Sequence, residues 1–163
     1  SKTKSTSISD SAADDLVNKI NNLIEKEHTD EFSVGRIRND LQESMEENAK
    51  IFRSEETLSK QTEILENLRE RYENVTIFDK GKVFNTELME AIELDYLLDM
   101  SESTVASALA RKESRGAHSR QDFPDRDDGN FMKHSFAFKN GNSANLRYKD
   151  VELGKYEPME RKY

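Results

Sequence analysis

The chain contains no cysteine, and its six glycines are scattered along 163 residues. Without cysteine it cannot form a disulfide, ligate an iron–sulfur cluster or use a thiol nucleophile. No two glycines are close enough for a GxGxxG turn or a P-loop, so the chain by itself lacks the usual cradle for a dinucleotide or phosphate. No apolar run approaches the roughly 18 residues of a membrane span, and no signal peptide is visible.

Basic residues are too few to balance the acids, and the formal net charge is −8. An acidic body argues against nucleic acid as a partner, because binding a polyanion requires clustered Lys and Arg. Only 34% of the residues are hydrophobic, but they are clustered, which predicts a folded core rather than disorder. The chain begins with Ser1 rather than Met, so we expect a piece of a longer protein.

Apolar residues at helical spacing predict a helical bundle over residues 10–114, after a loose Ser/Thr/Lys-rich segment at residues 1–9. The first helix is short and is expected to end near His28. Ser33 is a reasonable cap for a second helix, and Ser54 predicts a new helix start or a kink.

Asn85 is predicted to cap the last long helix, which runs to Ala110. Its apolar residues lie on several sides between Leu88 and Met100, so we expect this helix to be buried on several sides at the centre of the bundle. It leads directly into the segment Arg111–Asp128.

The segment Arg111–Asp128 carries five basic and five acidic residues and is neutral within an acidic chain. A solvated charge run usually shows one sign or a helical repeat, and this segment shows neither. We therefore predict a docking loop, with intramolecular ion pairs as the alternative for any single arginine. Gly116 is expected to turn with positive φ as the C′ residue of the helix. The predicted docking residues are Arg111, Glu113, Arg115, Gly116, His118, Arg120, Arg126 and Asp127.

The same segment offers weak support for chemistry of its own. An EF-hand register with Gly129 at position 6 places Pro124 and Arg126 where oxygen ligands are needed. His118 and Ser114 lie in no nucleophile-elbow context. We therefore predict no catalytic, metal-ligating or cofactor-binding residue in this chain.

After residue 128 the pattern becomes that of an extended arm. Phe136 alternates with Phe138, and Leu146 with Tyr148, which predicts two short strands around a turn at residues 139–142. Residues 115–163 are thus assigned to the docking loop and an extended C-terminal arm.

The Arg111–Asp128 segment, with Lys133-His134, closely resembles the C-terminal region of the flavoprotein subunit of succinate dehydrogenase and fumarate reductase. The resemblance covers about residues 33–163, through pieces at Ile37–Arg53, Leu68–Tyr72, Phe84–Asp95 and Tyr156–Tyr163. It implies a mainly α fold, namely a three-helix, spectrin-repeat-like bundle followed by a small extended or β C-terminal arm.

The resemblance further implies a parent oxidoreductase of electron transport and the tricarboxylic acid cycle. That enzyme carries FAD, usually attached through a His, and interconverts succinate and fumarate. Electrons leave through an iron–sulfur subunit toward quinone. The family's FAD-binding and substrate-binding residues lie upstream of this region, so the chain alone is expected to be soluble, inactive and free of FAD. The implied partners are the FAD-binding domain, the iron–sulfur subunit and a flavinylation assembly factor, at the cytoplasmic or matrix face of a membrane and without direct membrane insertion.

Two other readings stay open. The chain could be a stand-alone helical interaction module, or the equivalent domain of L-aspartate oxidase or adenylylsulfate reductase, which lack the full DFPDRDD stretch. In the docking hypothesis, Arg115, His118, Arg120 and Arg126 donate hydrogen bonds across the contact. Arg120→Ala and Arg126→Ala would then impair FAD retention or assembly more than melting of the bundle.

Overall fold

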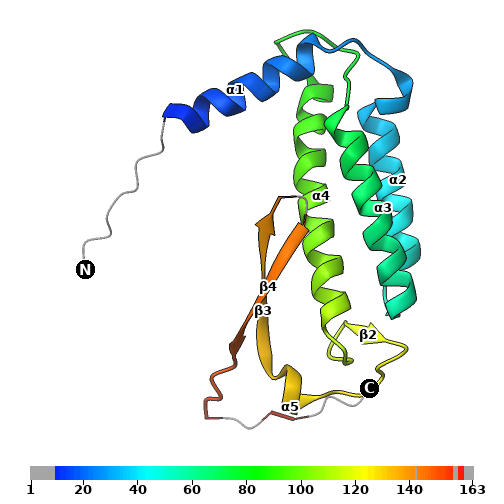
Figure 1. Ribbon diagram of the computed structural model, residues 1–163, viewed down its shortest axis with the longest axis vertical. Coiled ribbons are helices and arrows are strands. Elements are labelled where there is room, and N and C mark those ends of the chain that lie inside the picture. The colour runs from blue at the N-terminus through cyan, green and yellow to red at the C-terminus, as the bar shows by residue number, and fades with distance from the viewer. Residues whose placement is uncertain (1–9, 142, 156–157, 160–163) are drawn as a thin grey trace.

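The computed structural model describes residues 10–141, 143–155 and 158–159. It shows long helices side by side and a β-hairpin against one of them (Figure 1). Most of the stretch at residues 156–163, which resembles a terminal strand in the family, lies outside the described residues, as does the segment at residues 1–9. The helices are α1 (Asp10–Glu25), the 3₁₀ turn η1 (Asp30–Phe32), α2 (Val34–Asn48), α3 (Glu55–Glu73), α4 (Thr86–Ala110) and α5 (Asp128–Phe131). The strands are β1 (Phe52–Arg53), β2 (Ser119–Arg120), β3 (Lys133–Asn140) and β4 (Ser143–Asp150).

The helix starts follow from local capping groups. Ser54 Oγ accepts from the Thr57 backbone N–H at 3.2 Å, and Thr57 Oγ1 accepts from the Ser54 N–H at 3.1 Å, which makes a capping box. Asn85 Oδ1 accepts from the Leu88 N–H at 2.7 Å. Both predicted starts are confirmed, and Ser33 occupies the N-cap of α2. The first helix ends at Glu25, slightly before the predicted position.

The core lies between α2, α3 and α4. Ile37, Leu58, Leu94 and Leu98 are each 0% exposed there. Burying such side chains stabilises the fold by about 1.5–3 kcal/mol each. The core also encloses a satisfied polar cluster of three residues: Ser44, Asn48 and Gln61.

Helix α4 contacts α1, α2, α3 and both strands of the β3–β4 hairpin, so the expectation that it is buried on several sides is confirmed, but one of its faces is open. Met89 is 57%, Tyr96 60% and Met100 66% exposed. These positions are seven and four residues apart, so they share one helix face. Helix α4 packs against α3 and the β3–β4 hairpin on its other sides, and nothing in the described chain covers this face.

The hairpin pairs β3 with β4 antiparallel, from Lys133↔Asp150 to Asn140↔Ser143. Both strands are longer than the alternating pattern predicts, because backbone pairing continues past the apolar residues. Gly141 has φ +61° at the turn, a left-handed conformation that favours glycine. The hairpin lies along α4 (Figure 1).

The loop after α4 returns to the bundle through a second pairing. Strand β2 pairs in parallel with β1, which lies between α2 and α3. The Gln121 N–H donates to the Arg53 carbonyl at 2.8 Å. Residues about 65 positions apart are thereby fixed at the same end of the bundle.

Gly116 has φ +59°, so the predicted positive φ is confirmed, but its predicted place as C′ is wrong. Helix α4 ends at Ala110. Gly116 instead lies in a tight turn in which Arg115 and His118 exchange backbone hydrogen bonds of 2.8 and 3.0 Å.

Candidate functional site

The Arg111–Asp128 segment is organised around the Glu113 carboxylate, whose side chain is 0% exposed. It accepts from Arg111 Nη1 at 2.6 Å, from Arg115 Nε at 2.8 Å and from the Asp127 backbone N–H at 2.8 Å. Burial by itself raises the pKa of Glu113, but these hydrogen bonds outweigh it and hold the pKa below its ordinary value. Glu113 is therefore a buried, ionised anchor for the loop.

Arg120 is the second buried ion, at 0% exposure. Its Nη1 donates to the carbonyls of Ala108 and Leu109 at 3.0 and 3.1 Å. Its Nε and Nη2 donate to both Asp122 oxygens at 2.8 Å, and Nη2 also donates to Glu55 at 2.8 Å. The Phe123 ring lies 5.0 Å from the guanidinium.

These contacts account for all five N–H groups of the Arg120 guanidinium. The hydrogen bond to Asp122 raises the pKa of Arg120, and the same bond lowers the pKa of Asp122. Arg120 thus caps the end of α4 and joins it to α3 through Glu55.

The docking prediction needs correction for two of its residues. Arg120 cannot donate across an interface, because its donors are used within the chain, and the Glu113 side chain is not at the surface. Both residues instead form ion pairs within the chain, which was the alternative to docking. Docking by the segment as a whole stays a prediction.

The other predicted docking residues lie nearer the surface and also have internal partners. Arg115 and Arg126 both bind Asp128, at 2.7 Å each, and Arg126 Nη1 donates to the Met159 carbonyl at 3.0 Å. Asp127 caps the short helix α5 by accepting from the Asn130 N–H at 3.0 Å. The segment is therefore cross-linked within itself.

His118 joins the loop to both neighbouring elements. Its Nε2 lies 3.1 Å from the Arg111 carbonyl and its Nδ1 lies 3.1 Å from Arg53 Nη1. A carbonyl only accepts and a guanidinium only donates, so Nε2 carries the proton and the ring is neutral. Burial lowers the pKa of His118, and the charges of Arg53, Arg120 and Arg111 lower it further.

The arrangement gives no nucleophile. Ser114 Oγ donates to the Phe123 carbonyl at 2.8 Å and accepts from the Arg120 N–H at 2.8 Å, so it serves the loop backbone. Among the described residues, no group of three or more His, Asp or Glu is placed to hold a metal ion. No helix in that part of the chain is both long and apolar enough to cross a bilayer.

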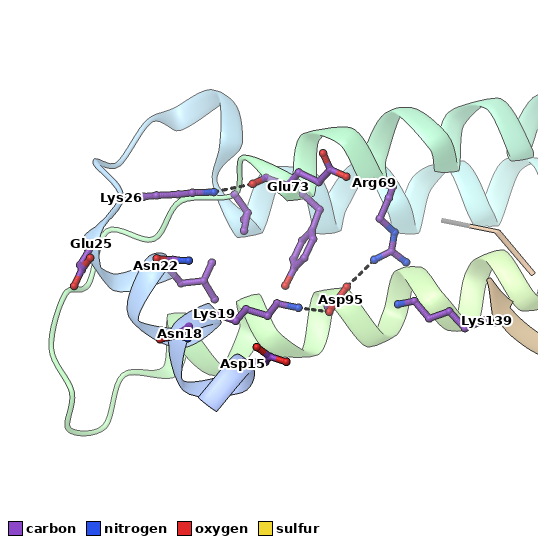
Figure 2. A pocket seen from close by; sticks show the side chains of 13 residues that line it. Asp15, Asn18, Lys19, Asn22, Glu25, Lys26, Arg69, Glu73, Asp95 and Lys139 are labelled. Atoms are coloured by element: carbon purple, nitrogen blue, oxygen red, sulfur yellow. Dashed lines mark hydrogen bonds and ion pairs between the residues drawn. The ribbon is translucent and has the colours of Figure 1, made fainter. Parts of the chain in front are cut away.

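A hollow of about 810 Å³ that is lined by charged residues lies between α1, α3 and α4. Figure 2 shows Lys19 and Arg69 both pointing toward Asp95. Arg69, at 5% exposure, also binds Asp99 and Glu102 at 2.6 and 2.8 Å. Burial raises the pKa of Asp95, but the bonds from Lys19 and Arg69 outweigh it and lower the pKa. Lys19, Arg69 and Asp95 of this hollow are thus paired with one another.

Sequence reasoning missed an apolar cluster in the connection between α3 and α4. Phe78 is 76%, Val83 77% and Phe84 98% exposed. Phe84 also has φ +54°, which is uncommon for a bulky residue. Its position directly before the Asn85 cap was the only signal available in the sequence.

The fold and the charged loop define a helical domain of the kind found at the end of large flavoproteins. A solved structure of Escherichia coli quinol fumarate reductase superposes with a TM-score of 0.85 and 34% identity, over 96% of this chain and 28% of that one. Residues 38–163 match the family described as fumarate reductase flavoprotein C-term, and the chain belongs to that family.

Two curated relatives support the same family assignment. The Haemophilus influenzae fumarate reductase flavoprotein subunit is 38% identical over 94% of this chain, and the Rickettsia bellii succinate dehydrogenase flavoprotein subunit is 36% identical over 90%. This chain spans 26% and 24% of those relatives. Adenylylsulfate reductase from Archaeoglobus fulgidus shares the fold at a TM-score of 0.78, with 22% identity.

Proposed function

We propose that this chain is the non-catalytic C-terminal helical domain of a subunit that interconverts succinate and fumarate. The observation that carries the proposal is the family match over residues 38–163 together with relatives that align over nearly the whole chain. Because the chain spans about a quarter of those relatives, the activity belongs to the parent subunit.

In this proposal FAD is bound by the part of the subunit that precedes this domain. The scattered glycines support that division, since a dinucleotide cradle needs clustered glycines at a helix N-terminus. The parent passes electrons to an iron–sulfur subunit and on to quinone, at the cytoplasmic or matrix face of a membrane. A flavinylation factor acts on the parent rather than on this domain.

The domain's proposed role is to dock on the FAD-bearing part. Two surfaces support it: the outer residues of the Arg111–Asp128 segment and the exposed face of α4 formed by Met89, Tyr96 and Met100. Glu113 and Arg120 hold the first surface in shape from inside. Apolar side chains left open on a helix otherwise covered by its neighbours are typical of an interface.

The direct test compares this chain with the complete subunit. We expect the chain to be helical, colourless and unable to oxidise succinate, and the subunit with its upstream region to retain flavin and turn over. Stoichiometric flavin on this chain, or a flavin-bearing subunit that oxidises L-aspartate but not succinate, would contradict the proposal.

A surface variant tests docking itself. Arg126→Ala in the complete subunit is expected to weaken flavin retention or assembly while the melting of this chain changes little, since the partners of Arg126 among the described residues are Asp128 and the Met159 carbonyl near the surface. Arg36→Ala, at an exposed arginine of α2, is the matched control. Equal flavin content and assembly in both variants would remove Arg126 from the interface.

Two alternatives are weaker. An adenylylsulfate reductase domain is supported by fold alone, at 22% identity, against 38% for the fumarate reductase relative. If the chain is a stand-alone interaction module, no flavin-binding region is encoded upstream in the same reading frame. Sequencing the upstream region therefore decides between this alternative and the proposed subunit domain.

A further inference from the structure

Arg53 differs from the other described arginines that are at least partly buried, because it has no acidic partner. Among the described residues, each of the other arginines that is at least partly buried forms an ion pair with Asp or Glu. Arg53 is partly buried too, yet no carboxylate of the described chain lies within ion-pair distance of it. The two remaining described arginines, Arg36 and Arg147, are exposed.

The Arg53 guanidinium is held firmly despite this lack. Its Nε donates to the carbonyls of Ala49 and Lys50 at 3.1 and 2.7 Å. Its Nη1 faces His118 Nδ1 at 3.1 Å. Its Nη2 has no hydrogen-bond partner in the described part of the chain. Burial lowers the pKa of Arg53, which is the expected effect on a cation without a counter-charge.

Arg53 lines a hollow of about 500 Å³, which we call the Arg53 hollow. Arg111, His118 and the hydroxyl-bearing residues Ser103, Thr104 and Ser107 also line it. No described Asp or Glu lines it, although the chain carries 33 acidic residues. The lining therefore offers positive charge and hydroxyl donors, whereas the hollow in Figure 2 has acidic residues in its lining, and one of them, Asp95, pairs with Lys19 and Arg69.

The nearby C-terminus of α4 would normally repel an anion, because its last carbonyls carry partial negative charge. Here three of the carbonyls at this end already have side-chain donors. Arg120 donates to the carbonyls of Ala108 and Leu109, and His118 Nε2 donates to that of Arg111. The helix end therefore opposes an anion in the hollow only weakly.

We propose that the Arg53 hollow is a binding site for a carboxylate group, held by the free edge of Arg53 and the hydroxyls of Ser103 and Ser107. The net charge of the lining favours a monoanion. Arg111 is already compensated by Glu113 at 2.6 Å, so Arg53 supplies one uncompensated positive charge. A planar carboxylate can accept from two N–H groups of one guanidinium, and it carries the single negative charge that Arg53 balances.

The carboxylate can come from two sources: an Asp or Glu side chain in the part of the subunit that this chain lacks, or a small free acid. The site itself does not depend on the proposed function, because the residues that form it all lie within this chain. The experiment therefore first measures binding to the chain alone and then determines the source.

The first measurement follows the His118 imidazole nitrogens by NMR while acetate replaces chloride at constant ionic strength. Three cations, Arg53, Arg111 and Arg120, act on this ring. A bound carboxylate offsets the nearest of them, so we expect a saturable change and an upward shift of the His118 pKa. Arg53→Gln is expected to abolish the response, and Arg36→Gln to preserve it.

If Arg53→Gln fails to fold by circular dichroism, Ser107→Leu fills the hollow without touching the guanidinium and is expected to abolish the response as well. The absence of any acetate effect beyond that of chloride would overturn the proposal. So would an unchanged response in a folded Arg53→Gln or Ser107→Leu chain.

The source is read from the reaction of Arg53 with phenylglyoxal, followed by peptide mass spectrometry. Acetate is expected to protect Arg53 in this chain. In the complete subunit, protection without added acid assigns a carboxylate of the subunit itself, and protection that needs acetate assigns a free acid. Equal reactivity of Arg53 and Arg36 under every condition would overturn the site, while leaving the flavoprotein assignment untouched.

Discussion

At the scale of single residues, Glu113 and Arg120 are buried ions of opposite charge that never touch each other. Each is surrounded by its own partners: Glu113 by Arg111 and Arg115, and Arg120 by Asp122 and Glu55. A buried ion is tolerated only when its hydrogen-bonding groups are satisfied. Removing either ion therefore leaves the groups around it without a hydrogen-bond partner.

Arg120→Ala is expected to lower the free energy of unfolding by about 3–5 kcal/mol, because it leaves two helix-end carbonyls and two carboxylates without their donor. Arg120→Lys is expected to recover only part of this loss, since an ammonium cannot reproduce the guanidinium fork. Urea unfolding of the chain measures both. Arg36→Ala, at an exposed position, is expected to stay within about 0.5 kcal/mol of the parent chain. Equal stability of Arg120→Ala and Arg36→Ala would show that the cluster contributes nothing.

Glu113 makes the stability of the chain depend on pH in acid. Its folded-state pKa lies below the unfolded value of about 4.3, so its contribution is complete above that value. The contribution is lost as the pH falls through the lower folded pKa. We expect Glu113→Gln to be clearly destabilised at pH 7 and to differ less from the parent chain as the pH drops below about 4. Urea unfolding across this range tests it, with exposed Glu66→Gln as the control. If the difference in unfolding free energy between Glu113→Gln and the parent chain stays constant with pH, Glu113 is not the ionised anchor described above.

At the scale of secondary-structure elements, one ion network joins α1, α3, α4 and β3. Arg69 of α3 binds three acids of α4, namely Asp95, Asp99 and Glu102. Lys19 of α1 also binds Asp95, and Lys139 of β3 binds Asp99 at 2.6 Å. The acidic residues of α4 thus hold α1 through Lys19 and β3 through Lys139.

Lys139→Met is expected to loosen the hairpin without unfolding the bundle. Lys139 is 55% exposed, so its ion pair with Asp99 contributes at most about 1 kcal/mol. Amides of β3 and β4 are then expected to exchange hydrogen up to about fivefold faster, while core amides of α2 and α3 are unchanged. Lys149→Met, on an exposed position of β4 without an ion pair in the described chain, is the control. Identical exchange in both variants would show that the ion pair does not hold the hairpin.

The helix starts could be predicted from the sequence because their causes are local. Ser54 and Asn85 cap helices through groups only three residues away. The position of Arg53 could not be predicted, because its neighbour His118 is brought there by the β1–β2 pairing of segments about 65 residues apart. The same distance explains why Arg120 was assigned to an outer surface: nothing local indicates that Glu55 and the end of α4 surround it.

At the scale of the whole molecule, the surfaces available for contact with a partner lie at both ends of the bundle. The Arg111–Asp128 loop with β2 lies at one end, and the connection between α3 and α4 lies at the other (Figure 1). The Arg53 hollow belongs to the first end because β1 pairs with β2, and the exposed residues Phe78, Val83 and Phe84 belong to the second. The open face of α4 lies between them. The family's relatives are about four times longer than this chain, so their remaining length is sufficient to cover such a surface.

Phe84 combines a left-handed backbone with 98% exposure, which costs the isolated chain stability on two counts. A bulky residue at positive φ costs on the order of 1–3 kcal/mol, and an exposed ring recovers none of it by packing. We expect Phe84→Gly to stabilise this chain by about 1 kcal/mol, since glycine removes the strain but adds freedom to the unfolded state. Phe78→Gly, at an exposed position without positive φ, is expected to change stability in the opposite direction.

The same substitution has the opposite expected effect in the complete subunit. If Phe84 is strained because the ring is placed for a partner surface, Phe84→Gly stabilises the isolated domain yet weakens its attachment to the rest of the subunit. Urea unfolding of the chain measures the first effect. Limited proteolysis between the domain and the upstream region measures the second, with faster cleavage expected in the variant. A stabilised domain with unchanged cleavage would leave Phe84 as strain without a docking role, and a destabilised domain would show that the ring supports the α3–α4 connection itself.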